Sequence, residues 1–242
     1  MKLEIHENCY EFHLAFKKSI AGLNGLYRGY HEFTKRDRLS SILRQAYGSF
    51  GRALEVATED DQTEVIRMLL EYRANDKAPD GSFCSALETA SRKGRTGIVR
   101  MLLESGADIH AVGSALQAAS THGRIEIVRL LLQNGSDFKK VGWRYGNSVL
   151  PAAALQAATE RGHAEVVKML LERGANVNTA DGWGDSPLLV ASALGRIDIV
   201  RLLLAKGANV NSSGGIYRSA LQAARGHTEV FQLLYECGAK WE

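Results

Sequence analysis

Apolar and polar positions along this chain follow a unit that returns about every 33 residues. Each unit opens with a leucine in a short apolar stripe and continues through an Ile/Val/Leu stripe. From the second unit on, one glycine lies at the bend between the stripes and another at the end, where the first unit has Asp61 and Arg73. The spacings between successive opening leucines are 33, 29, 39, 33 and 33 residues. Constant stripes joined by variable connectors predict two short helices per unit, stacked on the next unit. The opening leucines are Leu54, Leu87, Leu116, Leu155, Leu188 and Leu221.

The unit at 178–211 is the best preserved and shows how each segment is built. Ser186 and Pro187 read as an N-cap followed by proline at the first helical position. Gly195 is placed to end this first helix in a left-handed turn, and Gly207 ends the second helix in the same way. Helices this short are marginal in water alone, so each pair has to stack on its neighbours. The pattern therefore predicts an all-α solenoid.

These residues resemble the ankyrin repeat, whose typical line reads D-G-x-T-P-L-H-x-A-A-x-x-G-x-x-x-I-V-x-L-L-L-x-x-G-A-D-V-N. The resemblance covers about residues 49–242, with Ala-Leu-Gln or Ala-Leu-Glu replacing Pro-Leu-His in most units, a variant common in large fungal arrays. It implies six helix-turn-helix repeats with short β-hairpin-like fingers and a protein-binding function. The expected repeats are 49–81, 82–110, 111–140, 141–178, 179–211 and 212–242.

Three connectors depart from the common length. The finger before Leu116 is four residues short and the one before Leu155 is six residues longer, which predicts a notch beside a projecting ledge. The sixth unit lacks two residues before Gly226, so we expect a shortened first helix there.

Residues 1–48 lack the repeat and carry two apolar stripes at helical spacing. We expect a helical cap that covers the open face of the first repeat, because solenoids need capped ends. The alternative is an independent targeting or effector segment that recruits a complex while the repeats select the target.

Charge and composition narrow the partner class. Residues 1–48 hold eight of the 30 Lys and Arg and five of the 27 Asp and Glu, so the rest of the chain carries 22 of each sign. An array without net charge is a poor docking surface for a nucleic acid. No stretch reaches the roughly 18 apolar residues that span a membrane, and the N-terminus does not resemble a signal peptide. Three scattered cysteines favour an intracellular, cytoplasmic or nuclear protein.

The sequence contains no recognisable catalytic, cofactor or metal motif. Walker-type, H-E-x-x-H, G-x-S-x-G and G-x-G-x-x-G patterns are absent. His163 and His227 follow a glycine at the same position of their units, so we interpret them as turn residues. An enzyme with an unrecognised site is the remote alternative to a non-enzymatic adaptor or scaffold in signalling, transcriptional or pathway regulation.

By the resemblance, a protein partner contacts the finger tips and the last residues of each first helix, which line a concave groove. Trp143, Arg144 and Trp183 read either as partner contacts or as packing between fingers, since exposed tryptophan is typical of interfaces. The change from Glu59 and Asp60 to Arg92 and Lys93 predicts a ligand of mixed charge. The candidate partner-binding residues are Ser82, Arg92, Lys93, Thr121, His122, Trp143, Arg144, Glu160, Arg161, Trp183, Ile216 and Arg218.

Overall fold

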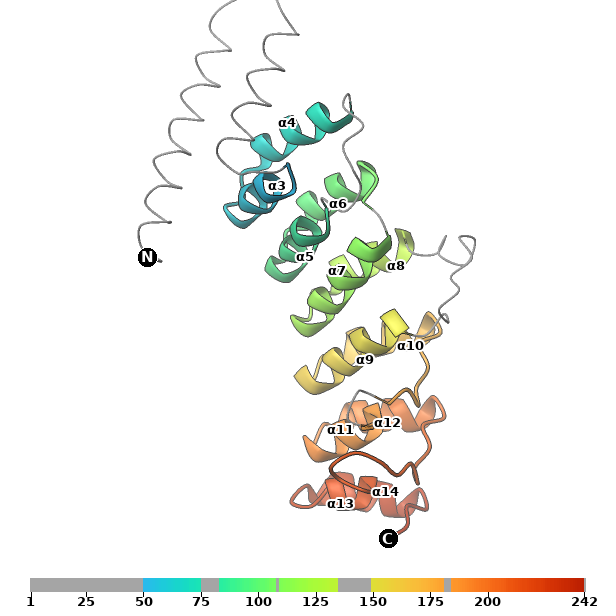
Figure 1. The fold of residues 1–242 in the computed structure, drawn as a ribbon. Coiled ribbons are helices and arrows are strands. Elements are labelled where there is room, and N and C mark those ends of the chain that lie inside the picture. Colours follow the sequence, from blue (N-terminus) through green and yellow to red (C-terminus); the bar gives the residue numbers. More distant parts are fainter. Residues whose placement is uncertain (1–49, 75–82, 108, 135–148, 181–183, 242) are drawn as a thin grey trace, which may run out of the picture.

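The structure is a computed structural model and describes residues 50–74, 83–107, 109–134, 149–180 and 184–241. Within these ranges twelve helices follow one another as six pairs, stacked along one axis from α3–α4 to α13–α14 (Figure 1). The pairs are α3 (Phe50–Glu59) and α4 (Thr63–Ala74), α5 (Cys84–Lys93) and α6 (Thr96–Glu104), α7 (Ile109–Thr121) and α8 (Ile125–Asn134), α9 (Val149–Arg161) and α10 (Ala164–Glu172), α11 (Pro187–Ala193) and α12 (Ile197–Ala205), and α13 (Ala220–Ala223) and α14 (Thr228–Glu236).

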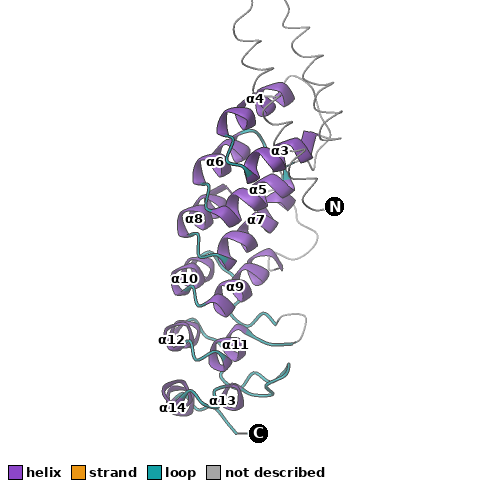
Figure 2. Cartoon of the chain, turned by 90° about the vertical axis from the view of Figure 1, so that its left-hand side faces the viewer, coloured by secondary structure: helices purple, strands orange, loops and turns teal. Residues whose placement is uncertain are grey.

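The two helices of each pair belong to two different layers. Figure 2 shows α4, α6, α8, α10, α12 and α14 along one side and α3, α5, α7, α9, α11 and α13 along the other. The loop before α13 extends beyond the layer of first helices. The all-α solenoid predicted from the sequence is thereby confirmed.

The core is a continuous seam between the layers and between successive pairs. Each of the six opening leucines is at most 5% exposed. Val99, Val128, Val167 and Val200, one turn into the second helices, are fully buried. Burying one such side chain stabilises the fold by about 1.5–3 kcal/mol, and the next pair provides much of that burial. Stacking therefore stabilises helices that would be marginal alone.

In the fifth pair, the N-cap, the proline start and the glycine bend predicted from the sequence are present. The side chain of Ser186 accepts a hydrogen bond from the backbone N–H of Leu189, and Pro187 begins α11. Gly195 follows α11 with φ +64°, a left-handed conformation that glycine adopts without a Cβ clash. Ser186 and Gly195 therefore mark the beginning and the end of this first helix.

Parts of the connectors before Leu116 and Leu155 are helical. The rest of the longer connector, 135–148, lies outside the described residues, so the ledge stays a prediction. α7 begins at Ile109 and α9 at Val149, so the segments read as fingers add turns to the first helices. Val112, in the added part of α7, is 5% exposed, and this burial favours helix over an open finger. The expected boundary between residues 110 and 111 falls inside α7. The shortened first helix of the sixth unit is confirmed, since α13 spans only four residues.

Much of the expected fingers, at 75–82, 135–148 and 181–183, lies outside the described residues. In the part of the chain that the structure describes, Gly214 and Arg218 form one isolated antiparallel bridge in the loop before α13. The predicted cap at 1–48 lies outside the described residues.

Candidate partner-binding surface

On α5 and α7 one stripe of residues stays exposed after the pairs have stacked, whereas in α11 the residues from Pro187 to Ser192 are buried. On α5 the exposed residues Ser85, Glu88 and Arg92 recur every three or four positions, and the residues between them are mostly buried. On α7 the corresponding exposed residues are Ser114 and Gln117. A helix that packs on one side presents such a stripe on the other. We call this surface of the odd-numbered helices, α3 to α13, the first-helix face.

The chemistry of the first-helix face changes along the stack. The position directly after the opening leucine is Glu55 in α3 and Glu88 in α5, but glutamine in α7 and α9. At the end of α11 the exposed residue is Leu194, at 43% exposure. At the position after the opening leucine, the face therefore changes from acidic on α3 and α5 to uncharged and polar on α7 and α9.

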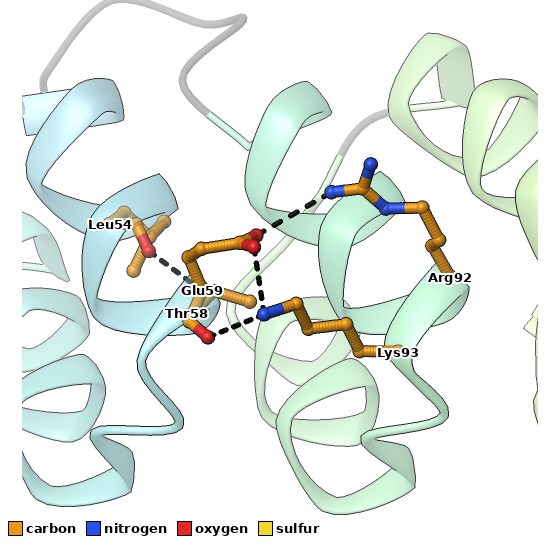
Figure 3. Close-up of polar contacts among 5 residues, drawn as sticks. All are labelled: Leu54, Thr58, Glu59, Arg92 and Lys93. Atoms are coloured by element: carbon orange, nitrogen blue, oxygen red, sulfur yellow. Dashed lines mark hydrogen bonds and ion pairs between the residues drawn. The ribbon is translucent and has the colours of Figure 1, made fainter. Parts of the chain in front are cut away.

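Arg92 and Lys93, two of the predicted contact residues, bind a carboxylate of the preceding pair. Lys93 Nζ lies 2.7 Å from Glu59 Oε1, and Arg92 Nη2 lies 3.5 Å from Glu59 Oε2 (Figure 3). Lys93 also donates to the Glu59 carbonyl oxygen at 2.8 Å. Beneath them the buried Thr58 hydroxyl donates to the Leu54 carbonyl at 2.7 Å. The cations thus join two helix pairs.

A second ion pair lies at the same joint. Arg95 Nη1 is 2.9 Å from Asp61 Oδ2. Asp61 has φ +59°, at the position where later units have glycine. These opposite charges thus pair with each other across neighbouring helix pairs, and the expected mixed-charge ligand stays a prediction. Neither the spacing within one unit nor its composition reveals such pairing.

The remaining predicted helix positions are exposed or half-buried at the ends of α7 and α9. The Thr121 hydroxyl donates to the Gln117 carbonyl at 2.8 Å, and His122 Nδ1 lies 2.9 Å from the Ala118 carbonyl oxygen. Glu160 and Arg161 are exposed, and no ion pair among the described residues includes either. Their contact with a partner stays a prediction.

His163 and His227 lie at the bends, as predicted, and each reaches the preceding pair. His163 Nε2 lies 3.1 Å from the Thr121 carbonyl oxygen, and His227 Nε2 lies 3.1 Å from the Ala193 carbonyl oxygen. Each ring also packs beside the glycine of the previous bend, Gly123 or Gly195. These contacts give both histidines a structural role.

The finger before α13 carries the last two predicted residues, Ile216 and Arg218. Ile216 is 75% exposed, and Arg218 is exposed with φ +59°. Tyr217 in the same finger is 38% exposed, whereas Phe83, directly before α5, is buried. The other predicted contacts, Ser82, Trp143, Arg144 and Trp183, lie outside the described residues.

Sequence reasoning missed the polar middle of the first-helix face, Ser114 and Gln117. Their positions, two residues before and one after the opening leucine, were a usable signal, because helix periodicity places them opposite the buried side. Within the described ranges no group of three or more His, Cys, Asp or Glu is arranged to hold a metal ion. None of the described helices is long and apolar enough to cross a membrane.

Stacked helix pairs with a constant core and a variable exposed face define a helical-repeat array. The family model described as "Ankyrin repeats (3 copies)" matches residues 56–142, 111–181 and 155–242. The chain therefore belongs to the ankyrin-repeat family, whose repeats are generally protein–protein interaction modules. A search of curated proteins finds no match.

Proposed function

We propose that this protein is a non-enzymatic adaptor or scaffold that holds a protein partner on the first-helix face and the finger tips. The supporting observation is the contrast between buried and exposed positions of the first helices. Buried positions repeat leucine and alanine, whereas the position after the opening leucine, which is exposed in α5 and α7, changes from Glu88 to Gln117. Stacking constrains the first set only, so the second is available for recognition.

The middle of the face is the best place for a partner segment to lie. At the joint between α3 and α5 the charged side chains form ion pairs with each other. The exposed residues of α7, Ser114 and Gln117, are uncharged. Uncharged polar side chains can exchange hydrogen bonds with water for bonds with a peptide at little desolvation cost. The predicted end residues Thr121, His122, Glu160 and Arg161 border this region.

The role in signalling, transcription or pathway regulation and the cytoplasmic or nuclear location remain part of this proposal. Recruitment of a complex by residues 1–48 remains an alternative prediction. Deleting 1–48 separates the two ideas, since loss of a cap lowers the stability of the array. Loss of a recruiter removes a partner and leaves the array folded.

The test is an affinity pull-down with quantitative mass spectrometry, using the full chain as bait. Gln117→Arg places a long cation in the middle of the first-helix face, and Gln133→Arg makes the same exchange on α8, the other helix of that pair. Both positions are exposed, so circular dichroism should show equal stability. We expect a discrete protein to be retained by the wild type and by Gln133→Arg and lost by Gln117→Arg.

Two outcomes contradict the proposal in different ways. If wild type retains no protein above empty resin, the adaptor function is wrong. If Gln117→Arg retains the same proteins as Gln133→Arg, an interaction exists but uses another surface.

A further inference from the structure

We propose that the finger before α13 is a rigid knob whose Ile216 inserts into an apolar, carboxylate-rimmed pocket of a folded protein partner. This inference rests on the proposed adaptor function and deepens it, because it names the anchor and the chemistry of the partner. The finger tip comprises Ile216, Tyr217 and Arg218.

Exposure singles out Ile216 among the large apolar side chains. At 75% it is the most exposed of the described large hydrophobic residues, and the neighbouring Tyr217 is also exposed, at 38%. An isolated exposed apolar residue needs no explanation, but two consecutive ones on a projecting tip form a compact apolar surface. Burying such a side chain in a partner's pocket is the usual source of an interface hot spot.

The finger that carries the tip packs closely against the preceding finger. The Gly214 N–H donates to the Arg218 carbonyl at 3.4 Å, and Ser212 Oγ lies 3.2 Å from Ser186 Oγ of the preceding finger. A Cβ at Gly214 would meet the Gly184 carbonyl oxygen at 2.6 Å. The backbones of successive fingers are therefore in direct contact, which fixes the tip before any partner arrives and lowers the entropy lost on binding.

Gly215 also packs against the preceding finger. The carboxylate of Asp185, a residue that is 5% exposed, lies where a Cβ of residue 215 would be, and Gly215 has φ +63°. A side chain at this position would push the finger away from Asp185 without changing the tip itself. A substitution at position 215 would therefore displace the finger tip without changing the side chains of Ile216, Tyr217 and Arg218.

Arg218 adds strain and charge. Its φ of +59° is rare for a residue other than glycine, and such strain persists only where the surrounding structure imposes it. Arg218 is exposed, and no ion pair among the described residues includes it. A guanidinium beside an apolar anchor matches a pocket with a carboxylate at its rim, because bidentate arginine–carboxylate pairs add specificity.

The first experiment identifies what the tip touches. A photo-crosslinking residue, p-benzoylphenylalanine, replaces Ile216 in one full-chain protein and Gln133 on α8 in a control, and both are irradiated in lysate of the source cells. We expect one protein to be crosslinked from position 216 and not from position 133. Crosslinking to a second copy of this chain, or the same proteins from both positions, would overturn the proposal.

The second experiment measures the affinity of that crosslinked protein, purified, by calorimetry. Ile216→Asp should weaken binding by about 30-fold or more, and Ile216→Leu by less than about 3-fold, because only the first loses the apolar anchor. Arg218→Asn keeps a residue that tolerates positive φ and removes the charge, so it should reduce affinity and its salt dependence. Gly215→Ala should weaken binding with the tip residues unchanged.

Thermal unfolding of each variant by circular dichroism distinguishes a lost contact from a lost fold, since Ile216 and Arg218 are exposed. If Ile216→Asp binds as tightly as wild type while Gln117→Arg does not, the knob is wrong and the adaptor function stands. If wild type binds no protein, both fail. Binding to phosphatidylcholine vesicles that Ile216→Asp abolishes would assign the tip to a lipid surface and overturn the proposal.

Discussion

The joint between the first two described helix pairs and the joint between the last two rest on the same apolar packing but differ in polar chemistry. Leu87 of α5 and Leu221 of α13 are both buried against the preceding pair. At the first joint, the polar contacts at the bends are ionic, from Glu59 to Arg92 and Lys93 and from Asp61 to Arg95. At the last joint, the bend contact is His227 Nε2 to the Ala193 carbonyl.

Neutral hydrogen bonds also tie the far edge of the last joint. Asn211 Nδ2 donates to the Gly238 carbonyl at 3.3 Å, and the Lys240 N–H donates to Asn211 Oδ1 at 2.8 Å. Arg201 and Glu229 form one ion pair there, with side chains 58% and 70% exposed. Polar coupling at the last joint is therefore carried mainly by backbone groups.

Because the two joints differ in polar chemistry, salt should affect their stability unequally. Exposed ion pairs contribute at most about 1 kcal/mol and weaken as salt rises. A hydrogen bond to a backbone carbonyl is much less sensitive to ionic strength. We expect the first joint to loosen with salt and the last joint to stay closed, although both bury the same kind of core.

The largest expected effect comes from Gly195→Ala at the last joint. The new Cβ would sit at positive φ and meet His227 Cε1 at 2.6 Å, so we expect a loss of about 2–3 kcal/mol in the free energy of unfolding. Urea denaturation measures it. Gly106→Ala is the matched control, because Gly106 has φ +85° with nothing within 4 Å of the new Cβ. Equal losses in both variants would show that the His227 contact is irrelevant.

His227→Ala should cost about 1 kcal/mol, since it removes the bond to the Ala193 carbonyl and the packing on Gly195. Hydrogen exchange followed by mass spectrometry should show the loss of protection in α13 and α14 rather than in α3. His122→Ala is the control, because His122 Nδ1 contacts the Ala118 carbonyl oxygen, four residues earlier in the same helix pair. A loss of protection spread evenly over the array would contradict a local joint.

Gly97→Ala should raise stability by about 0.5 kcal/mol. Gly97 lies in the first turn of α6, in the second pair, and nothing lies within 4 Å of an added Cβ. Alanine loses less backbone entropy than glycine when a helix forms. The urea midpoint should shift upward with an unchanged slope, and a downward shift would mean that Gly97 has a packing role.

The smallest effect is expected from Glu59→Gln, a loss of a few tenths of a kcal/mol at low salt. At about 1 M salt, where the Debye length is about 3 Å, wild type and variant should become equal. Hydrogen exchange in peptides from Phe50–Glu59 measures this directly. Glu64→Gln is the control, since Glu64 pairs with Arg67 inside α4. If salt loosens α13 as much as α3, the comparison between the joints is wrong.

Part of the candidate site could be predicted from the sequence and part could not. Helix periodicity placed Arg92, Lys93 and Thr121 at the ends of first helices, where the structure has them. It could not show that Arg92 and Lys93 face Glu59, which lies 33 and 34 residues earlier. The register between stacked pairs determines such contacts, and no single unit contains that register.

The local architecture could be predicted from the sequence, because apolar spacing, the serine–proline helix start and the glycine bends act within a few residues. Three features became visible only in the tertiary structure. Charged residues of neighbouring pairs form ion pairs, and the residues before Leu116 and Leu155 extend α7 and α9. The finger that carries Ile216 packs against the preceding finger. These outcomes depend on burial and on contacts between residues about 30 positions apart. They exist only once the pairs have stacked.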